Sequence, residues 1–218
     1  MDVAVRVLTW VFPELSVPGS SVLGMANFSP SDVLYITTEY RTMAELCDGR
    51  ACSAAQVGAL VAAGRLPAAT YTLPSGEARF PPDYFALVDD VAAAGADELA
   101  AHFRARYLAA GGTAAAADED WAGYLTGGFG VCLRSVTPEA MVAKNRLIAR
   151  VEELAGAPAP DDEDWRGALR AAVGELDELL RPFTDFDRER WEDTSRDRHI
   201  KRVRESWPEV FGHALRGA

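Results

Sequence analysis

A cluster of basic residues near the C-terminus is the first place in this sequence where binding chemistry can be expected. Guanidinium and ammonium groups bind sulfate, phosphate and carboxylate through charge-assisted hydrogen bonds. On a helix these side chains would surround most of the circumference, with Asp197 and Glu205 among them. A solvated charged face is therefore the ordinary interpretation, and an anion site is the functional one. The cluster consists of Arg196, Arg198, Lys201, Arg202 and Arg204, and His199 lies near them in the sequence.

Three bases and one tyrosine elsewhere in the chain are further candidates for contact with a substrate. Arg134 follows a glycine-rich stretch, whereas Lys144 and Arg181 lie in segments with helical periodicity. Each base is more often an ion-pair partner than a ligand-binding group. Tyr124 could line a pocket, although packing in a core is the ordinary use of such a side chain. The predicted substrate- or anion-binding residues are Tyr124, Arg134, Lys144, Arg181, Arg198 and His199.

Two carboxylates could act as a general acid or base if the fold buries them. Glu139 and Asp187 are the candidates, because burial is what moves a carboxyl pKa towards neutrality. Glu139 follows Thr137-Pro138, so a role in the first turn of a helix suits it equally well. The residue pattern assigns no catalytic residue.

Metal and cofactor sites are not expected from the cysteine and histidine pattern. The chain has three cysteines and three histidines, and they form no CxxC, HxxxH or HExxH motif of the kind that zinc sites use. Cys47 and Cys52, five positions apart, are expected to be free thiols, with a regulatory disulfide as the alternative. Gly127-Gly128-Phe129-Gly130 lacks the third glycine of a GxGxxG phosphate loop. We expect a tight packed bend there and no cofactor.

The elements that would position these residues are mainly helical. We predict a multi-helix bundle that carries an N-terminal winged helix-turn-helix-like unit with one small β-hairpin. The predicted parts are an apolar arm over residues 1–30, the winged unit over 31–84 and a helical domain over 85–218. The arm either packs on the body or presents Trp10 and Phe12 to a partner protein.

The winged unit is predicted from capping and turn signals. Thr37 or Thr38 could cap a helix that runs through Cys47, and Ser53 with Gln56 forms a capping box for the next helix. Pro74-Ser75-Gly76-Glu77 then separates two short apolar runs, as expected of a hairpin. The second helix lacks bases, and residues 31–84 hold six acids and four bases. Since phosphate contacts dominate DNA affinity, a protein-binding role is favoured over DNA binding.

The helical domain is predicted from apolar periodicity and helix-stop residues. One long helix begins near Asp83 and kinks at Gly95. Helices over 138–155 and 164–181 pair antiparallel across a short proline-containing linker. Ser195 caps a last helix that stops at Pro208.

Charge and composition restrict the partners. The 218 residues carry 33 acids and 22 bases, a formal net charge of −11, which repels nucleic acid and anionic lipid at long range. No apolar stretch is long enough to cross a bilayer, and the N-terminus does not resemble a signal peptide. We therefore expect a cytoplasmic protein that acts on neither nucleic acid nor membranes.

Three stretches together resemble one protein family. They begin at Leu60 (LVAAGRLPAATYTLPSGEARFPPDYF), Tyr124 (YLTGGFGVCLRSVTPEAMVAKNRLIARVEEL) and Asp161 (DDEDWRGALRAAVGELDELLRPFTDFDRERW), and SRDR follows at Ser195. In this order they are similar to an uncharacterised, DUF6058-like family of small proteins found in actinobacterial natural-product gene clusters. The resemblance covers nearly the whole chain, and it implies no catalytic residue.

The same resemblance extends to the small subunit of the two-protein complex that closes an aziridine ring in azinomycin-type pathways. There a sulfated diamino acid, held on an amino-group carrier protein, cyclises with loss of sulfate. The resemblance thus implies a subunit of a biosynthetic complex, an obligate partner subunit and a sulfate-bearing substrate. A DNA-binding pathway regulator and a stand-alone biosynthetic enzyme, with a pocket near Tyr124, Arg134 and Arg181, remain the alternatives.

Overall fold

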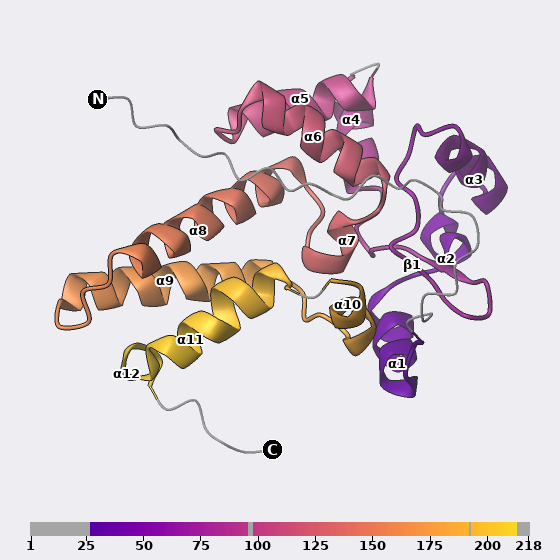
Figure 1. The fold of residues 1–218 in the computed structure, drawn as a ribbon. Coiled ribbons are helices and arrows are strands. Elements are labelled where there is room, and N and C mark those ends of the chain that lie inside the picture. The colour runs from indigo at the N-terminus through magenta and orange to yellow at the C-terminus, as the bar shows by residue number, and fades with distance from the viewer. Residues whose placement is uncertain (1–26, 96–97, 192, 213–218) are drawn as a thin grey trace, which may run out of the picture.

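The computed structural model describes residues 27–95, 98–191 and 193–212, and this part of the chain is mainly helical (Figure 1). It contains 12 α-helices, one π-helical turn and a two-stranded antiparallel hairpin. No helix among the described residues is both long and apolar enough to span a bilayer. Residues 1–26 of the predicted N-terminal arm lie outside the described residues.

The first three helices begin at reciprocal capping boxes. They are α1 (Pro30–Glu39), α2 (Met43–Cys47) and α3 (Ala54–Ala62), capped by Ser29, Thr42 and Ser53. In each box the cap side chain accepts from a backbone N–H, and the third helical residue reaches back to the cap. The box at Ser53 confirms the predicted start of α3, and Gly64 after it has the expected positive φ of 67°.

The single predicted helix from Thr37 or Thr38 through Cys47 is wrong. The chain is extended at Tyr40 and begins a new helix after Thr42. The cause is a long-range pairing, since the Arg41 and Phe80 backbones exchange two hydrogen bonds of 2.9 Å each. This bridge ties the α1–α2 connection to the exit of the hairpin, whose strands are β1 (Tyr71–Thr72) and β2 (Ala78–Arg79).

The predicted long helix from Asp83 to Tyr107 is also divided in two. Helix α4 (Ala86–Ala94) ends at Gly95, whose left-handed φ of 65° terminates it, and α5 (Leu99–Ala109) begins afresh. Gly95 is therefore a helix stop rather than a kink. Helix α6 (Ala114–Leu125) then packs on α5 and leads to the glycine bend.

The glycine bend is tightly packed, as predicted, and its close neighbours belong to the N-terminal unit. Gly127 has a φ of 77°, and a Cβ added there would lie 2.4 Å from the carbonyl oxygen of Ala68. The Thr70 hydroxyl donates to the Gly127 carbonyl at 3.1 Å. The short helix α7 (Phe129–Cys132) follows, and a Cβ on Gly130 would meet the Thr70 hydroxyl oxygen. Only glycine permits this approach.

Helices α8 (Pro138–Gly156) and α9 (Glu163–Leu179) form the predicted antiparallel pair. The Trp165 indole N–H donates to the Leu154 carbonyl across the linker at 3.0 Å. After α10 (Asp185–Arg190), the last long segment consists of a π-helical turn (Asp197–Lys201) and α11 (Arg202–Ser206), followed by α12 (Pro208–Phe211). The predicted cap at Ser195 is off by one residue, because Thr194 accepts the Asp197 N–H.

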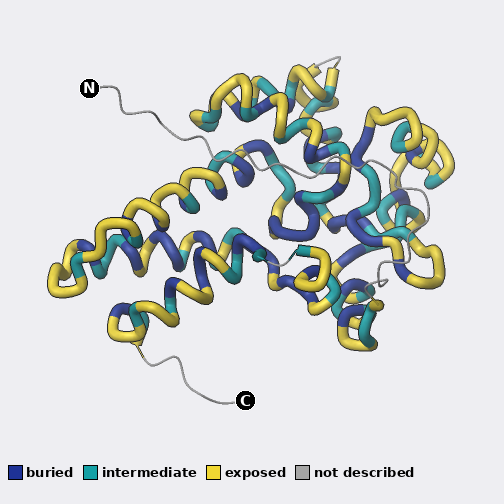
Figure 2. The backbone as a smooth tube through the Cα atoms, viewed as in Figure 1, coloured by how far each residue is buried: buried dark blue, intermediate teal, exposed yellow. Residues whose placement is uncertain are grey.

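The apolar core consists of two clusters, and each contains residues from both sides of residue 84. The larger cluster joins Ile36, Tyr40 and Tyr71 of the N-terminal unit to residues of α5, α8 and α9. A smaller cluster lies under α2, α3 and α4 and includes Cys47, Val57 and Phe85. Figure 2 shows the buried backbone concentrated where the hairpin and α7 meet the long helices.

We predict that Gly127→Ala lowers the free energy of unfolding by roughly 2–5 kcal/mol, from the left-handed backbone and the clash with the Ala68 carbonyl. Denaturant unfolding measures the change. Gly167→Ala is the matched control, since it lies inside α9 with nothing within 4 Å of the added Cβ. It should raise stability by about 0.5–1 kcal/mol. A Gly127→Ala protein as stable as the wild type would contradict the packing described here.

Candidate functional site

The site with the densest polar chemistry is buried between α1, the hairpin, α8 and α10. We call it the polar centre, and its members all have low exposure: Tyr40 0%, Tyr71 2%, Lys144 8%, Arg181 4% and Asp187 0%. Three of these side chains are ionisable groups that normally stay in water. Burial of such groups requires partners that replace hydration, so the contacts of each decide what the site can do.

An isolated β-bridge between Leu133 and Leu180 organises the basic side of the polar centre. The Arg181 N–H donates to the Cys132 carbonyl at 2.8 Å, and the Arg134 N–H donates to the Leu179 carbonyl at 3.1 Å. The bridge thereby joins the segment after α7 to the end of α9. It brings the predicted residues Arg134 and Arg181 together although 47 positions separate them.

The Arg181 guanidinium is held by backbone carbonyls and an aromatic face. Its Nε donates to the Leu133 carbonyl at 2.9 Å, and Nη2 donates to the Arg134 carbonyl at 3.1 Å. The guanidinium carbon lies 5.0 Å from the centre of the Tyr40 ring, and Nη1 is 3.5 Å from the Glu39 carboxylate. A fork of donors over an aromatic ring is the arrangement that arginine, and not lysine, can satisfy.

Lys144 approaches the same bridge from α8. Its Nζ donates to the Cys132 sulfur at 3.4 Å and lies 5.7 Å from the centre of the Phe129 ring. Cys132 thus contacts Lys144 through its sulfur and Arg181 through its carbonyl. Three of the six predicted site residues therefore lie around one bridge.

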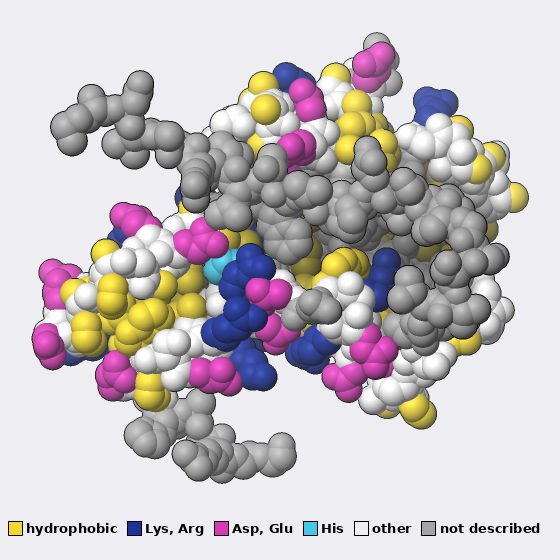
Figure 3. All heavy atoms as spheres, in the orientation of Figure 1, with side chains coloured by type: hydrophobic (Ala, Val, Ile, Leu, Met, Phe, Trp, Pro, Cys, Tyr) yellow, Lys and Arg dark blue, Asp and Glu magenta, His cyan; other side chains and the backbone are white. Residues whose placement is uncertain are grey.

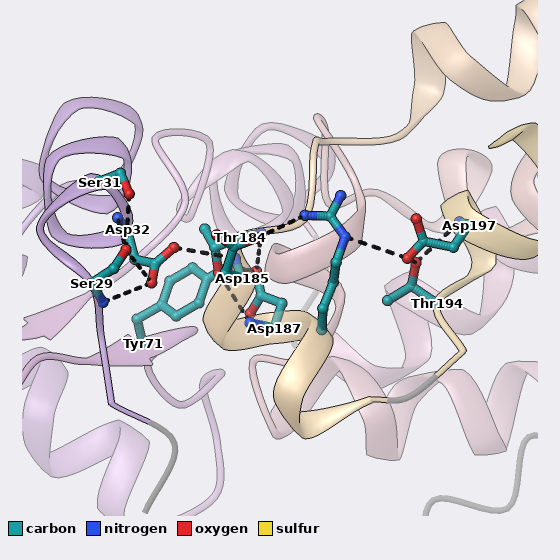
Figure 4. A network of polar contacts seen from close by, with 10 residues as sticks. Ser29, Ser31, Asp32, Tyr71, Thr184, Asp185, Asp187, Thr194 and Asp197 are labelled. Carbon is teal, nitrogen blue, oxygen red and sulfur yellow. Dashed lines mark hydrogen bonds and ion pairs between the residues drawn. The ribbon is translucent and has the colours of Figure 1, made fainter.

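The acidic side of the polar centre is a tyrosine–aspartate pair. The Tyr71 hydroxyl donates to Asp187 Oδ2 at 2.9 Å, and the Thr184 N–H and hydroxyl donate to the same oxygen (Figure 4). Burial raises the pKa of Asp187 above its ordinary value, while the hydrogen bonds from Thr184 and Tyr71 act against this rise. The other oxygen, Oδ1, has no hydrogen-bond partner among the described residues.

The network continues from Asp187 into α1. The Asp185 N–H donates to Asp32, a buried carboxylate that also caps α1 with Ser29. Arg188 pairs with both Asp185 and Asp197 and connects α10 to the π-helical turn. Polar groups from four segments of the chain therefore share one connected set of contacts.

The two carboxylates that the sequence singled out have different environments. Asp187 meets the condition of burial. Glu139 is exposed and forms a bidentate pair with Arg106, with N···O distances of 2.8 and 2.7 Å. That hydrogen-bonded pair lowers the pKa of Glu139, so it is suited to be an ion-pair partner rather than a proton donor. Asp187 is fully buried, and its hydrogen bond from Tyr71 holds the hairpin against α10.

Tyr124 lies apart from the polar centre, beside the glycine bend. It lines a cavity of about 20 Å³ together with Thr70, Asp83, Tyr84 and Gly127. That volume fits roughly one water molecule. Burial, assisted by the Asp83 charge, raises the pKa of Tyr124.

Arg198 and His199 lie on the π-helical turn rather than at the polar centre. His199 is buried, with Nδ1 3.1 Å from the Ser195 carbonyl and Nε2 2.9 Å from the Glu152 carboxylate on α8. Arg198 pairs with Asp193 at 2.7 Å. A π-helical turn is uncommon and often accompanies a functional constraint.

Two aspartates pair with four arginines of the basic cluster around these two residues. Arg196 and Arg204 both pair with Asp177 of α9, and Arg202 joins Arg198 on Asp193. In Figure 3 the blue side chains next to the cyan histidine form a contiguous stripe, with magenta side chains beside it. The arginines therefore hold the C-terminal helix to α9 and to the preceding loop, which is the ion-paired alternative to an anion site.

No pattern in the sequence indicates the open groove that lies between α2 and α4. Its volume is about 370 Å³, and Arg41, Glu45, Arg50, Phe85 and Asp89 are among its lining residues. Arg50 forms two hydrogen bonds with Asp89, of 2.8 and 2.6 Å, and stacks 4.5 Å from the centre of the Phe85 ring. The pairing spans 39 positions, and no local pattern signals it. Among the described residues, no group of three or more His, Cys, Asp or Glu side chains is arranged to hold a metal ion.

The fold and these contacts define a mainly helical protein whose buried polar centre joins a small hairpin to a helical body. A protein-family model matches residues 91–208, more than half of the chain, and its description is a family of unknown function, DUF6058. The chain belongs to this family. No curated protein and no solved structure matches it. The matched segment holds Lys144, Arg181 and Asp187, whereas Tyr40 and Tyr71 precede it.

We predict that Tyr71→Phe destabilises the protein by about 1–3 kcal/mol at neutral pH, because a buried oxygen of Asp187 loses a donor. The folded-state pKa of Asp187 is raised from its ordinary value of 3.8. The contribution of Asp187 to the stability of the fold is therefore fully present below pH 3.8, and it is lost as the pH rises through the folded-state pKa. Since the Tyr71 hydrogen bond opposes the rise, its removal should cost more at about pH 7 than at about pH 4.

Urea unfolding across that pH range measures the effect. Tyr84→Phe is the matched control, since the buried Tyr84 hydroxyl donates at 2.8 Å to a neutral acceptor, the Pro67 carbonyl. Its cost should not vary with pH in this range. In Asp187→Asn the pH dependence that Tyr71→Phe introduces should disappear. Equal pH profiles for Tyr71→Phe and Tyr84→Phe would contradict the assignment.

Proposed function

We propose that this protein is a partner-dependent, helical subunit of a natural-product biosynthetic complex, and that residues 31–84 form a winged helix-turn-helix-like scaffold that contacts protein rather than DNA. The observation that carries the proposal is the surface of α3, which is exposed and bears no charged residue. Family membership over residues 91–208 and the resemblance to biosynthetic proteins support it.

Apart from Gln56, the exposed face of α3 consists of small residues. Its exposed members are Ala55, Gln56, Gly58, Ala59 and Ala62. A helix that faces only water normally carries charges on its outer side, and small side chains permit close approach of another helix. In the view of Figure 3 this part of the molecule shows mostly white and yellow atoms. A helix of a second, different subunit fits this face.

The order α1, α2, α3, β1, β2 supports this proposal, in which α3 would take the place of the recognition helix. The charges around it do not suit DNA. Arg50 is paired with Asp89, and Arg79 with Glu77. With a net charge of −11 on the whole chain, a regulator that binds DNA is the weaker alternative.

Within the complex, we propose that the chain assists aziridine closure on a diamino acid held by an amino-group carrier protein. In that reaction the amine nitrogen attacks the carbon that carries the sulfate ester. A C–N bond forms, the C–O bond breaks, sulfate leaves with the bonding pair and the nitrogen loses a proton. A large anionic carrier-bound substrate would reach only exposed groups of this chain. Arg134 is the exposed candidate that is not paired with a carboxylate among the described residues.

A stand-alone enzyme with a pocket near Tyr124, Arg134 and Arg181 receives little support. Arg181 is enclosed by backbone and Tyr40, and the cavity at Tyr124 is about 20 Å³. That volume would not admit a diamino acid. A subunit that completes its site with a partner is compatible with both observations.

We predict that the chain, co-expressed with the proteins encoded beside it, is recovered in a stable complex. Ala59→Arg should weaken the complex at least ten-fold, because a charge would be buried at the interface without a partner. Ala171→Arg, an exposed alanine of α9, is the matched control and should bind like the wild type. Pull-down followed by titration calorimetry makes the comparison.

Two results would overturn the proposal. One is a fully active monomer that recruits no neighbouring protein. The other is tight, salt-sensitive binding to promoter DNA of its own gene cluster in a low-salt gel shift, which would favour the regulator. Self-association that Ala59→Arg abolishes would assign the α3 face to a second copy of this chain instead.

A further inference from the structure

We propose that Cys47 and Cys52 are a reversible oxidation site, which forms an intramolecular disulfide across the turn between α2 and α3. The Cys52 thiol donates to the Cys47 sulfur at a distance of 3.3 Å. A disulfide bond is about 2.05 Å long, so the sulfurs need to approach by little more than about 1 Å, within the range of small side-chain rotations. This inference is independent of the proposed function.

The backbone on both sides of the pair is fixed. Cys47 is the last residue of α2, and Cys52 precedes the N-cap of α3. Gly49 supplies the left-handed turn between them with a φ of 71°, and the Arg50 N–H donates to the Cys47 carbonyl at 3.0 Å. The two thiols are therefore held in contact by structure that exists before oxidation.

The exposure of the two cysteines gives them different roles. Cys52 is partly exposed, whereas Cys47 is 9% exposed in the smaller apolar cluster. Burial raises the pKa of Cys47, and its sulfur lies in contact with that of Cys52. Cys52 is thus the residue that a hydroperoxide reaches, and Cys47 is the resolving thiol.

The chemistry balances with a hydroperoxide as oxidant. The Cys52 thiol loses its proton, and the thiolate attacks one oxygen of hydrogen peroxide. The O–O bond breaks, a sulfenic acid forms, and the departing hydroxide takes up that proton and leaves as water. The Cys47 sulfur then attacks the Cys52 sulfur, the S–O bond breaks, and a second water leaves. Two thiols are oxidised and one peroxide is reduced. A dithiol reductant reverses the step by thiol–disulfide exchange.

The disulfide would act on the groove between α2 and α4. Arg50 lies within the loop that the bond closes, and it contacts Asp89 and Phe85 on the opposite wall. A covalent link between positions 47 and 52 restricts the backbone that carries this arginine. Oxidation therefore restricts the motion of Arg50 in the groove and of the backbone that leads into α3.

The test uses the full chain, reduced and then exposed to hydrogen peroxide. Trypsin cleaves after Arg41, Arg50 and Arg65, so the oxidised protein should yield residues 42–50 joined to residues 51–65 through one disulfide. Mass spectrometry of the unreduced digest should find this pair, and dithiothreitol should separate it. The oxidised protein should also melt at a higher temperature than the reduced one.

Cys132 provides the internal control. It is buried and contacts Lys144 rather than a thiol, so Cys132→Ser should oxidise like the wild type. Cys47→Ser should leave Cys52 as a sulfenic or sulfinic acid without the joined peptides. Absence of the joined peptides from the oxidised wild type, or cross-links that join two chains through Cys52, would overturn the proposal.

Discussion

The burial of the Arg181 guanidinium is the constraint on which the centre of this structure depends. An arginine that is 4% exposed must replace its lost hydration with fixed acceptors. The carbonyls of Leu133 and Arg134 serve as these acceptors, and they are in place only because the chain after α7 bridges to the end of α9. The guanidinium thus stabilises the junction of two segments whose own sequences specify no contact with each other.

The same guanidinium defines the place of the N-terminal unit. Its flat face lies on the ring of Tyr40, and the Tyr40 hydroxyl donates to the Gly130 carbonyl at 2.8 Å. Tyr40 in turn meets the edge of Tyr71, with ring centres 5.0 Å apart. Loss of any one of these contacts would leave a buried polar group unpaired. Such a group costs about 1–3 kcal/mol when it is neutral and more when it is charged.

The sequence was sufficient where local signals fix the structure and insufficient where distant partners do. Capping residues predicted the start of α3 at Ser53 and of α8 at Thr137, because a cap acts within one turn. The break between α1 and α2 was missed since it depends on Phe80, 39 positions away from Arg41. Likewise, the pKa of Asp187 depends on its burial. Tyr71, which helps to bury it, lies 116 positions away, so no local sequence pattern predicts this environment.

The polar centre is built from residues inside and outside the segment that matches the family. The matched residues 91–208 contribute the charges Lys144, Arg181 and Asp187, but the aromatic and hydroxyl partners Tyr40 and Tyr71 come from the unit before them. That unit is therefore part of the core and not an appended module. A partner that docks on α3 would press on a unit whose hairpin reaches Asp187 directly through Tyr71. Contact at α3 and the environment of Asp187 would then be linked through the hairpin, because Tyr71 of β1 donates to that aspartate. This link is a physical route by which a surface without charges could affect chemistry elsewhere in a complex.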